Sequence, residues 1–301
     1  MTDNSLSIII PARGESAEPD KNGNDRHEIF FKRTIEDVLE NAIGDIRVFP
    51  VIDGPYEPPP EDRVEDSRVE YIRMPIVSET QKRHGINKAV SITDSKYVMS
   101  LDAHCLVAKG FDEVLKAYHQ DNWIQIPRRH RLDPIAWGLQ PQSDERPPID
   151  YEYFKWYDLI EGNGLHGFRW DERTYARWDI MLDDTLEFQG SCWFMTKDYF
   201  NHLGLMQIEG YTGWGAEAEE LGFKARRDGG RVISNKYTYY AHLHKGKLGR
   251  LYHMSKNAIN ACNVFSRDYW VHENKDTFIK SIDQFWPLPK WPGDWKNRIY
   301  G

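Results

Sequence analysis

The sequence predicts an α/β fold built on a mostly parallel β-sheet that is flanked by helices. Through the first 127 residues, short apolar runs alternate with segments whose apolar residues recur every three or four positions. The runs are rich in β-branched residues and apolar at nearly every position, which is typical of strands buried on both faces. From residue 128 the pattern weakens, and we expect an aromatic-rich insertion and an irregular C-terminal tail to complete the fold.

The first half of the chain orders its elements as β-α-β-β-α-β, which implies parallel strands joined by covering helices. The segment 128–184 is rich in Trp, Tyr, Arg, Asp and Pro without clear periodicity, and its aromatic content argues against disorder. The pattern predicts strands at residues 6–11, 46–54, 69–74, 97–101, 123–127, 185–196 and 231–234, and helices at residues 27–42, 80–93, 111–119, 197–203 and 216–227.

Composition narrows the class of protein. The chain has 301 residues, of which 40% are hydrophobic, so it can bury a sizeable core. Its formal net charge of −8 argues against a protein that coats nucleic acid. Three widely spaced cysteines form neither a disulfide framework nor a C-x-x-C zinc site, and we expect a reducing, cytoplasmic location. No signal peptide and no apolar run near 18 residues is recognisable, so no membrane span is expected.

The central candidate site is the acid-x-histidine pair at the end of the apolar run 97–101. Residues two apart on a strand point the same way, so Asp102 and His104 can face one ligand. A carboxylate plus an imidazole suits Mn²⁺ better than Mg²⁺. Ligands of parallel α/β sheets bind at the carboxyl ends of strands, which is where this pair stands. An isolated pair of this kind also fits a capped turn with a surface histidine.

A second acid, Asp53, stands near the end of the predicted strand 46–54 and precedes a glycine. In an open α/β sheet such an acid commonly binds a ribose hydroxyl or a base edge, although Asp-Gly is also an ordinary turn. The chain contains no Walker-type Gly-Lys-Ser/Thr loop and no G-x-G-x-x-G after its first strand. P-loop NTPases and dinucleotide-binding enzymes are therefore excluded.

Two further motifs complete the candidate site. The glycine-rich stretch ahead of the helix 216–227 allows close approach to a ligand, and Trp214 can lie over a sugar ring. The acids Glu217 and Glu219 at this helix start are also favoured by the helix dipole alone. Farther on, one histidine of His242-x-His244 can complete the metal shell. The cations behind them, which can hold phosphates, include Lys245 and Lys247.

Together these motifs resemble the metal-dependent glycosyltransferases of the GT-A fold, glycosyltransferase family 2 in the broad sense. They are most similar to the polypeptide N-acetylgalactosaminyltransferases, and Leu101–Cys105 is the most specific match. The matching segments occur in the family's order across roughly residues 6–250 and are residues 8–11, 51–53, 83–89, 101–105, 188–190, 214–217 and 241–242.

The resemblance implies a nucleotide-sugar donor, most often a UDP-sugar, and Mn²⁺ (or Mg²⁺) bound by Asp102, His104 and His242. It implies that Glu217, beside Trp214, faces the transferred sugar. It also implies that Asp53 contacts uracil or ribose and that Arg83 contacts the donor. The full set of residues expected to bind the donor and its metal is Pro11, Arg13, Glu15, Asp53, Arg83, Asp102, Lys245 and Lys247.

We expect the chain to divide into a nucleotide-sugar-binding half (1–127), an acceptor-binding and catalytic half (128–265) and a C-terminal tail packed on the domain (266–301). The segment 128–184, which has no counterpart in the family, is interpreted as an acceptor-facing insertion, with a surface elaboration as the alternative. The resemblance also bears on the stereochemistry of transfer. It favours transfer with retention. In an inverting enzyme a carboxylate must deprotonate the acceptor, and Glu217 or Glu219 is then the candidate base.

The acceptor is left open between a glycan and a hydroxymethylated base of phage-type DNA. In the second case the basic stretch Arg128–Arg131 would contact phosphates, whereas a solvated basic turn is the simpler interpretation. Gly215–Ala218 departs from the family's Gly-Gly-Glu-Asn, and the secretory anchor, lectin domain and disulfides of the family have no counterpart, which disfavours a peptide acceptor. The alternative functions are a metal-dependent hydrolase and a non-catalytic carbohydrate-binding module.

Overall fold

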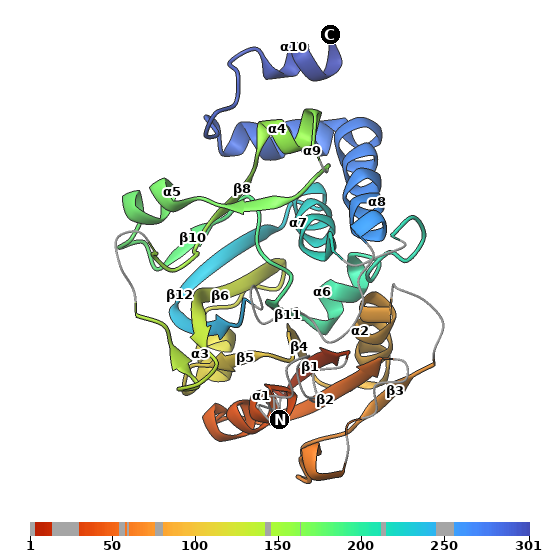
Figure 1. The fold of residues 1–301 in the computed structure, drawn as a ribbon, viewed down its shortest axis with the longest axis vertical. Coiled ribbons are helices and arrows are strands. Elements are labelled where there is room, and N and C mark those ends of the chain that lie inside the picture. The colour runs from red at the N-terminus through yellow and green to blue at the C-terminus, as the bar shows by residue number, and fades with distance from the viewer. Residues whose placement is uncertain are drawn as a thin grey trace, which may run out of the picture.

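A computed structural model of the chain describes residues 4–13, 30–53, 58, 60–75, 81–141, 146–162, 164–211, 215–244 and 256–301. Figure 1 shows a central sheet with helices on both sides. The strands are β1 (Leu6–Ala12), β2 (Ile46–Asp53), β3 (Ile72–Met74), β4 (Tyr97–Leu101), β5 (Cys105–Val107), β6 (Trp123–Asp133), β7 (Gly138–Leu139), β8 (Glu152–Phe154), β9 (Gly167–Arg169), β10 (Leu182–Asp184), β11 (Cys192–Thr196) and β12 (Arg231–His242). The α-helices are α1 (Phe30–Asn41), α2 (Gln81–Ile92), α3 (Phe111–Ala117), α4 (Trp156–Ile160), α5 (Asp171–Ala176), α6 (Lys197–His202), α7 (Glu217–Arg227), α8 (Lys256–Arg267), α9 (Lys275–Gln284) and α10 (Trp295–Tyr300), with a 3₁₀ turn η1 (Pro60–Asp62) and a π-helix η3 (Asp268–Glu273).

The main sheet has ten strands, and its longest path runs β10-β12-β6-β11-β4-β1-β2-β3. Strands β4, β1, β2 and β3 are parallel to one another, as are β12 and β6, and antiparallel β11 joins the two parallel blocks. The predicted α/β fold with a mostly parallel sheet flanked by helices is confirmed. The carboxyl ends of β2 and β4 and the end of β12 carry the predicted acids and histidine.

Both faces of the sheet are covered, which explains why its strands are apolar at consecutive positions. On one face Ile8 and Ile10 of β1 pack in a core with residues of α1 and α3. On the other face Ile9 packs in a core with residues of α2, α6 and α7. Helix α1 meets the sheet through Ile35 and Val38, the positions that the helical period predicted.

The predicted insertion contains more regular structure than its sequence indicated. Strand β6 continues past residue 127 to Asp133, because its pairing with β12 resumes at Arg128 and reaches Arg131 after a register shift. The boundary predicted between the two halves therefore lies inside a strand, and the functional division of the chain stays a prediction. Beyond β6, strands β8 and β9 form an antiparallel hairpin.

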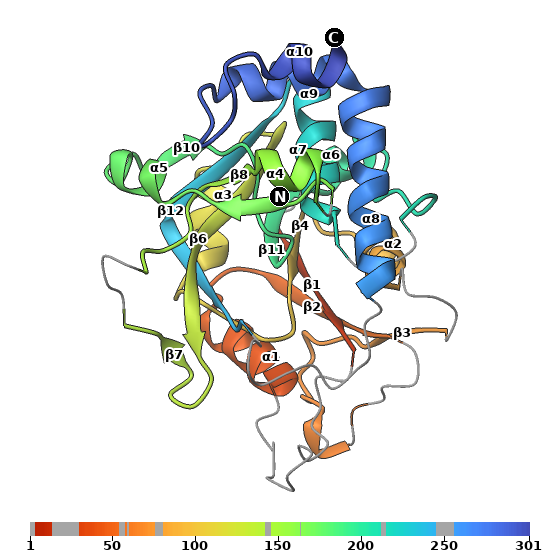
Figure 2. The same cartoon turned by 45° about the horizontal axis from the view of Figure 1, so that its top comes forward.

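The C-terminal tail is not irregular, which corrects the prediction. Helices α9 and α10 form there because apolar side chains spaced for a helix, such as Phe278 and Ile282, find a third core to enter. Figure 1 and Figure 2 both show α9 close to α4, with α10 farther from the sheet at the C-terminal end. This third core joins the tail to the insertion and contains Tyr151, Tyr153, Phe154, Leu159, Leu165, Trp170, Leu186, Phe223, Trp270, Val271, Phe278, Ile282, Phe285, Leu288, Trp291 and Trp295.

Two strand boundaries also differ from the prediction. The strand predicted at 185–196 is limited to β11, because the segment before it bonds other partners: the N–H of Thr185 donates to the carbonyl of Val232 at 3.0 Å, and that of Glu187 to the carbonyl of Glu152 at 3.2 Å. The strand predicted at 231–234 extends to His242 as β12, because it gains β6 and β5 as partners. Among the described residues, no helix is long and apolar enough to cross a membrane.

Replacing Phe278 by Ala should lower the free energy of unfolding by about 3–5 kcal/mol, because the ring is 0% exposed and contacts three other aromatic rings. Urea unfolding followed by fluorescence measures this. Phe168→Ala is the matched control, because that ring is 40% exposed. Equal losses in the two variants would contradict the third core as a major source of stability.

Candidate metal centre and active site

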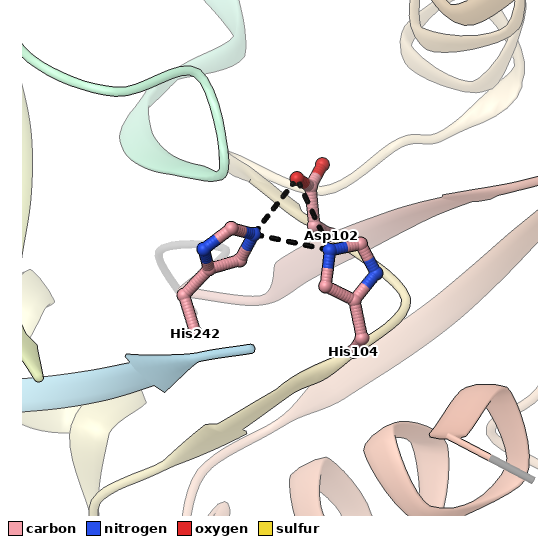
Figure 3. Close-up of side chains that lie close together, drawn as sticks. All are labelled: Asp102, His104 and His242. Atoms are coloured by element: carbon pink, nitrogen blue, oxygen red, sulfur yellow. Dashed lines mark hydrogen bonds and ion pairs between the residues drawn. The ribbon is translucent and has the colours of Figure 1, made fainter. Parts of the chain in front are cut away.

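Three side chains from distant parts of the chain meet at the carboxyl end of β4 (Figure 3). The Nε2 atoms of His104 and His242 are 3.1 Å apart. Oδ2 of Asp102 lies 3.5 Å from Nε2 of His242 and 4.0 Å from Nε2 of His104. The three residues predicted from the sequence as metal ligands therefore converge on one point.

Backbone pairing brings these residues together. Strand β4 ends at Leu101, and the backbone N–H of Asp102 donates to the carbonyl of Ser191 at 2.8 Å. After a tight turn, β5 pairs antiparallel with the end of β12, so that Cys105 lies opposite His242. The N–H of Leu243 donates to the carbonyl of His104 at 3.1 Å. Both histidines are thus held by the same short ladder.

This donor set fits a divalent ion of borderline character. Ligand atoms about 2.1 Å from one ion lie roughly 3–3.5 Å from each other, which is close to the separations found here. Burial lowers the pKa of His242 to about 3, against the pull of the Asp102 charge, so this imidazole is neutral at neutral pH and can bind a metal. A donor set of two imidazole nitrogens and one carboxylate oxygen suits Mn²⁺ or Zn²⁺.

Lys82 is a member of the site that the sequence analysis missed. Its Nζ donates to Oδ1 of Asp102 at 2.9 Å and to the carbonyl of Gly190 at 3.2 Å. Burial disfavours the charged carboxylate, but Lys82, His242 and His104 outweigh it and hold the pKa of Asp102 well below its ordinary value. Lys82 thus orients Asp102 with Oδ2 toward the histidines. Its position in sequence, one residue before the family-like segment 83–89, gives no signal of this role.

The candidate nucleotide contact lies two strands away. Asp53 ends β2, and its Oδ2 accepts a hydrogen bond from Nε of Arg13 at 2.6 Å. Arg13 lies just past the end of β1, the strand that contains Pro11. Burial raises the pKa of Asp53, while Arg13 opposes that shift. Among the described residues, Oδ1 of Asp53 has no hydrogen-bond partner although it is buried. That oxygen can accept a hydrogen bond from a ligand.

Arg83, which was predicted to contact the donor, is enclosed by the protein in this structure. Its guanidinium is 1% exposed, forms an ion pair with buried Glu220 and stacks over the ring of Tyr211 at 3.9 Å. It also donates to the carbonyls of Gln207 and Gly215, at 3.2 and 3.0 Å. A guanidinium so enclosed holds the chain ahead of α7, and in this structure it is not accessible to a nucleotide.

The predicted catalytic acids stand in the first turn of α7. Glu217 is 4% exposed, and a Cβ added to Gly190 would lie 3.4 Å from its Oε2, so Glu217 borders the glycine that Lys82 contacts. Oε1 of Glu219 accepts a hydrogen bond from the N–H of Gly167 at 3.3 Å. Glu217 is thus close to the metal centre, whereas Glu219 faces the hairpin β8–β9.

The carboxyl group of Glu219 interacts with another buried carboxyl group, that of Glu187. Burial raises the pKa of Glu219, and the nearby His166 opposes this shift. Burial, with the Glu219 charge added, raises the pKa of Glu187 well above its ordinary value. No motif in the sequence singled out Glu187, which is 1% exposed and whose Oε1 accepts a hydrogen bond from the N–H of Phe188 at 2.9 Å.

Four of the predicted site residues lie outside the described part of the chain. They are Glu15, Trp214, Lys245 and Lys247. Their predicted contacts with the donor and the transferred sugar stay predictions.

The strand order is that of a GT-A-type fold, and a solved structure shows the same fold. The structure described as "Crystal structure of GalNAc-T7 with UDP, GalNAc and Mn2+" matches 99% of this chain with a TM-score of 0.65 at 16% sequence identity, and the match covers 55% of that protein. The model of the family "Glycosyl transferase family 2" matches residues 7–204, more than half of the chain. The chain belongs to glycosyl transferase family 2.

Curated relatives point the same way. "Probable N-acetylgalactosaminyltransferase 8" of Caenorhabditis elegans is 25% identical over 165 residues, covering 52% of this chain and 37% of the relative. "Putative polypeptide N-acetylgalactosaminyltransferase 13" of Drosophila melanogaster is 28% identical over 163 residues, covering 50% of this chain and 26% of the relative. The chain thus matches well under half the length of these relatives. The predicted resemblance and the predicted class of enzyme are confirmed at the level of the family.

Replacing Arg83 by Met should lower the free energy of unfolding by about 3–5 kcal/mol, because it leaves Glu220 buried and without its guanidinium partner. The double variant Arg83→Met/Glu220→Gln should recover part of the loss, which urea unfolding can measure. Unchanged stability together with weaker UDP binding would instead restore Arg83 as a donor contact.

Replacing Glu187 by Gln should stabilise the protein increasingly as pH rises from 5 to 8. The folded-state pKa of Glu187 lies above its ordinary value of 4.5, so its contribution to stability is full below that value and is lost as pH rises through the folded pKa. The difference in melting temperature between variant and wild type, measured at several pH values, tests this. Glu65→Gln, at an exposed position, is the control. A difference independent of pH would contradict the assignment.

Proposed function

We propose that this protein transfers a sugar from a nucleotide-sugar, most simply a UDP-sugar, to an acceptor hydroxyl, with Mn²⁺ bound by Asp102, His104 and His242. The observation that carries the proposal is the convergence of these three side chains at the carboxyl end of β4. A sugar-binding module has no need of such a site. The fold is that of a protein solved with UDP, GalNAc and Mn²⁺, which supports the same ligand classes here.

The donor is best placed between β2 and the metal centre. Asp53 offers a buried carboxylate oxygen without a partner in the described chain, suited to a ribose hydroxyl or the N–H of uracil. Strand β2 is separated from β4 by β1 alone, so a nucleotide on Asp53 can direct its diphosphate toward Asp102. The remaining expected donor contacts, Pro11 and Arg13, border this path.

Bound at this site, a divalent ion supplies positive charge for the diphosphate that leaves. Lys82 keeps Asp102 ionised and aimed at the histidines, and Glu217 lines the side toward Gly190, where the transferred sugar would lie. During transfer the bond between the sugar C1 and the phosphate oxygen breaks and a bond from C1 to the acceptor oxygen forms. We favour retention, in which the acceptor proton passes to the leaving phosphate. In an inverting enzyme Glu217 or Glu219 would take it.

The acceptor is a glycan or a hydroxymethylated base of DNA. A metal-dependent hydrolase is the second candidate, because two histidines and a carboxylate also suit hydrolytic zinc sites. A cytoplasmic location remains a prediction from the sequence.

UDP in the presence of Mn²⁺ should raise the melting temperature, whereas UDP with EDTA should not. At a hundredfold excess over Kd, binding to the native state adds about 2.7 kcal/mol of stability. His104→Ala should abolish the metal-dependent part of the shift, because it removes one of three ligands. His272→Ala, at an exposed position, is the matched control.

The outcomes separate the candidate functions. Stabilisation by Mn²⁺ with no added effect of UDP would favour the hydrolase, and no effect of either would favour the binding module. A metal-dependent UDP shift that survives in His104→Ala would show that the ligand assignment is wrong. A panel of nucleotide-sugars, read by mass spectrometry against DNA and glycan acceptors, then identifies the substrates.

A further inference from the structure

Two arginines of β6 lie on the same face of the sheet as the metal centre. Arg129 and Arg131 are two residues apart on a strand, so their side chains point the same way. In the parallel pairing of β6 with β12, Arg131 lies beside His242 and Arg129 beside Tyr240. Neighbours in register share a face of the sheet, which puts both guanidinium groups on the side of the metal ligand His242.

Strands β8 and β9 bring charges of both signs to the same place, because Arg169 forms an ion pair with Asp171 at 2.6 Å. Nη2 of Arg129 donates to Oε1 of Glu152 at 2.9 Å, and Glu152 is paired across the hairpin with Arg169. Loss of hydration lowers the pKa of Arg131, and the like charges of Arg169, Arg129 and Arg146 lower it further. We refer to Arg129, Arg131, Arg146 and Arg169 as the arginine cluster.

The cluster adjoins the metal centre. His242 is a proposed metal ligand, and Arg131 lies beside it in the register of β6 with β12. The arginines and the proposed metal site therefore meet at the end of β12.

Arg129 is buried, and two of its guanidinium nitrogens donate no hydrogen bond within the described part of the chain. Its side chain is 4% exposed, yet Nε and Nη1 make no hydrogen bond with any described residue. Leaving buried charged donors unsatisfied is costly, and an anion that accepted from them would remove that cost. Its neighbour Arg128 shows the contrast, because two of its nitrogens bond both oxygens of Asp150, at 2.9 and 2.7 Å.

We propose that the arginine cluster binds a phosphate group of the acceptor, next to the sugar that is transferred. The proposal rests on the proposed function and narrows its acceptor to a phosphate-bearing molecule. The sheet order favours the acceptor over the donor as the source of the phosphate, since β2 with Asp53 lies on one side of β4 and β6 lies on the other. A tetrahedral phosphate can accept from several guanidinium groups at once, which suits four arginines better than a carboxylate does.

The experiment titrates methyl phosphate into the full-length protein saturated with Mn²⁺ and UDP, at constant ionic strength, and measures binding by calorimetry. Arg131→Gln is the main variant, because Arg131 is half-buried and its loss costs less in folding than that of Arg129. Arg47→Gln is the matched control for charge, since that side chain is 60% exposed and stands on β2. Arg129→Gln is added where circular dichroism shows that it folds.

Wild type and Arg47→Gln should bind methyl phosphate, and Arg131→Gln should bind it about tenfold more weakly while its affinity for UDP and Mn²⁺ stays within twofold. Equal binding in all variants, or equal binding of acetate, would overturn the proposal. A parallel loss of UDP affinity in Arg131→Gln would also overturn it, because the cluster would then serve the donor diphosphate. Repeating the titration with EDTA and without UDP keeps this result separate from a failure of the proposed transferase function.

Discussion

The site depends on the antiparallel pairing of β5 with the end of β12. This short ladder joins segments 138 residues apart and places His104 beside His242, with Asp102 anchored by its own N–H to Ser191. Backbone hydrogen bonds therefore hold together the segments that carry all three candidate ligands.

Two adjacent cations on α2 perform opposite tasks. Successive helical residues point about 100° apart, so Lys82 can face the metal ligand while Arg83 enters the space beneath the start of α7. Lys82 neutralises part of the charge of Asp102 at the surface of the site. Arg83 forms a buried ion pair with Glu220 and donates a hydrogen bond to the carbonyl of Gly215, two residues before Glu217. The position of the candidate catalytic acid thus depends on a buried charge pair.

The stretch Arg128–Arg131 and the C-terminal tail show that local sequence pattern alone did not predict their secondary structure. The stretch Arg128–Arg131 looks in sequence like a basic turn, but it is a strand because β12 lies alongside it. Strand alternation then separates its arginines, sending Arg128 to Asp150 and Arg129 toward Glu152. In the same way the tail becomes helical because Phe278 and its neighbours find the aromatic side chains of the insertion, a contact between distant segments.

The sequence by itself determined the sheet of apolar strands, the helices of the first half and the residues Asp53, Asp102 and His104, because strand period, helical period and strand-end position are local properties. It also singled out His242 by motif, without the means to choose it over His244. Only the tertiary structure shows that His242 meets Asp102 and His104, that Arg83 is buried, and that Lys82 and Glu187 lie close to the acids of the candidate site. Each of these follows from which side chains meet across the fold, and burial and charge pairing between distant residues leave no periodic trace in the chain.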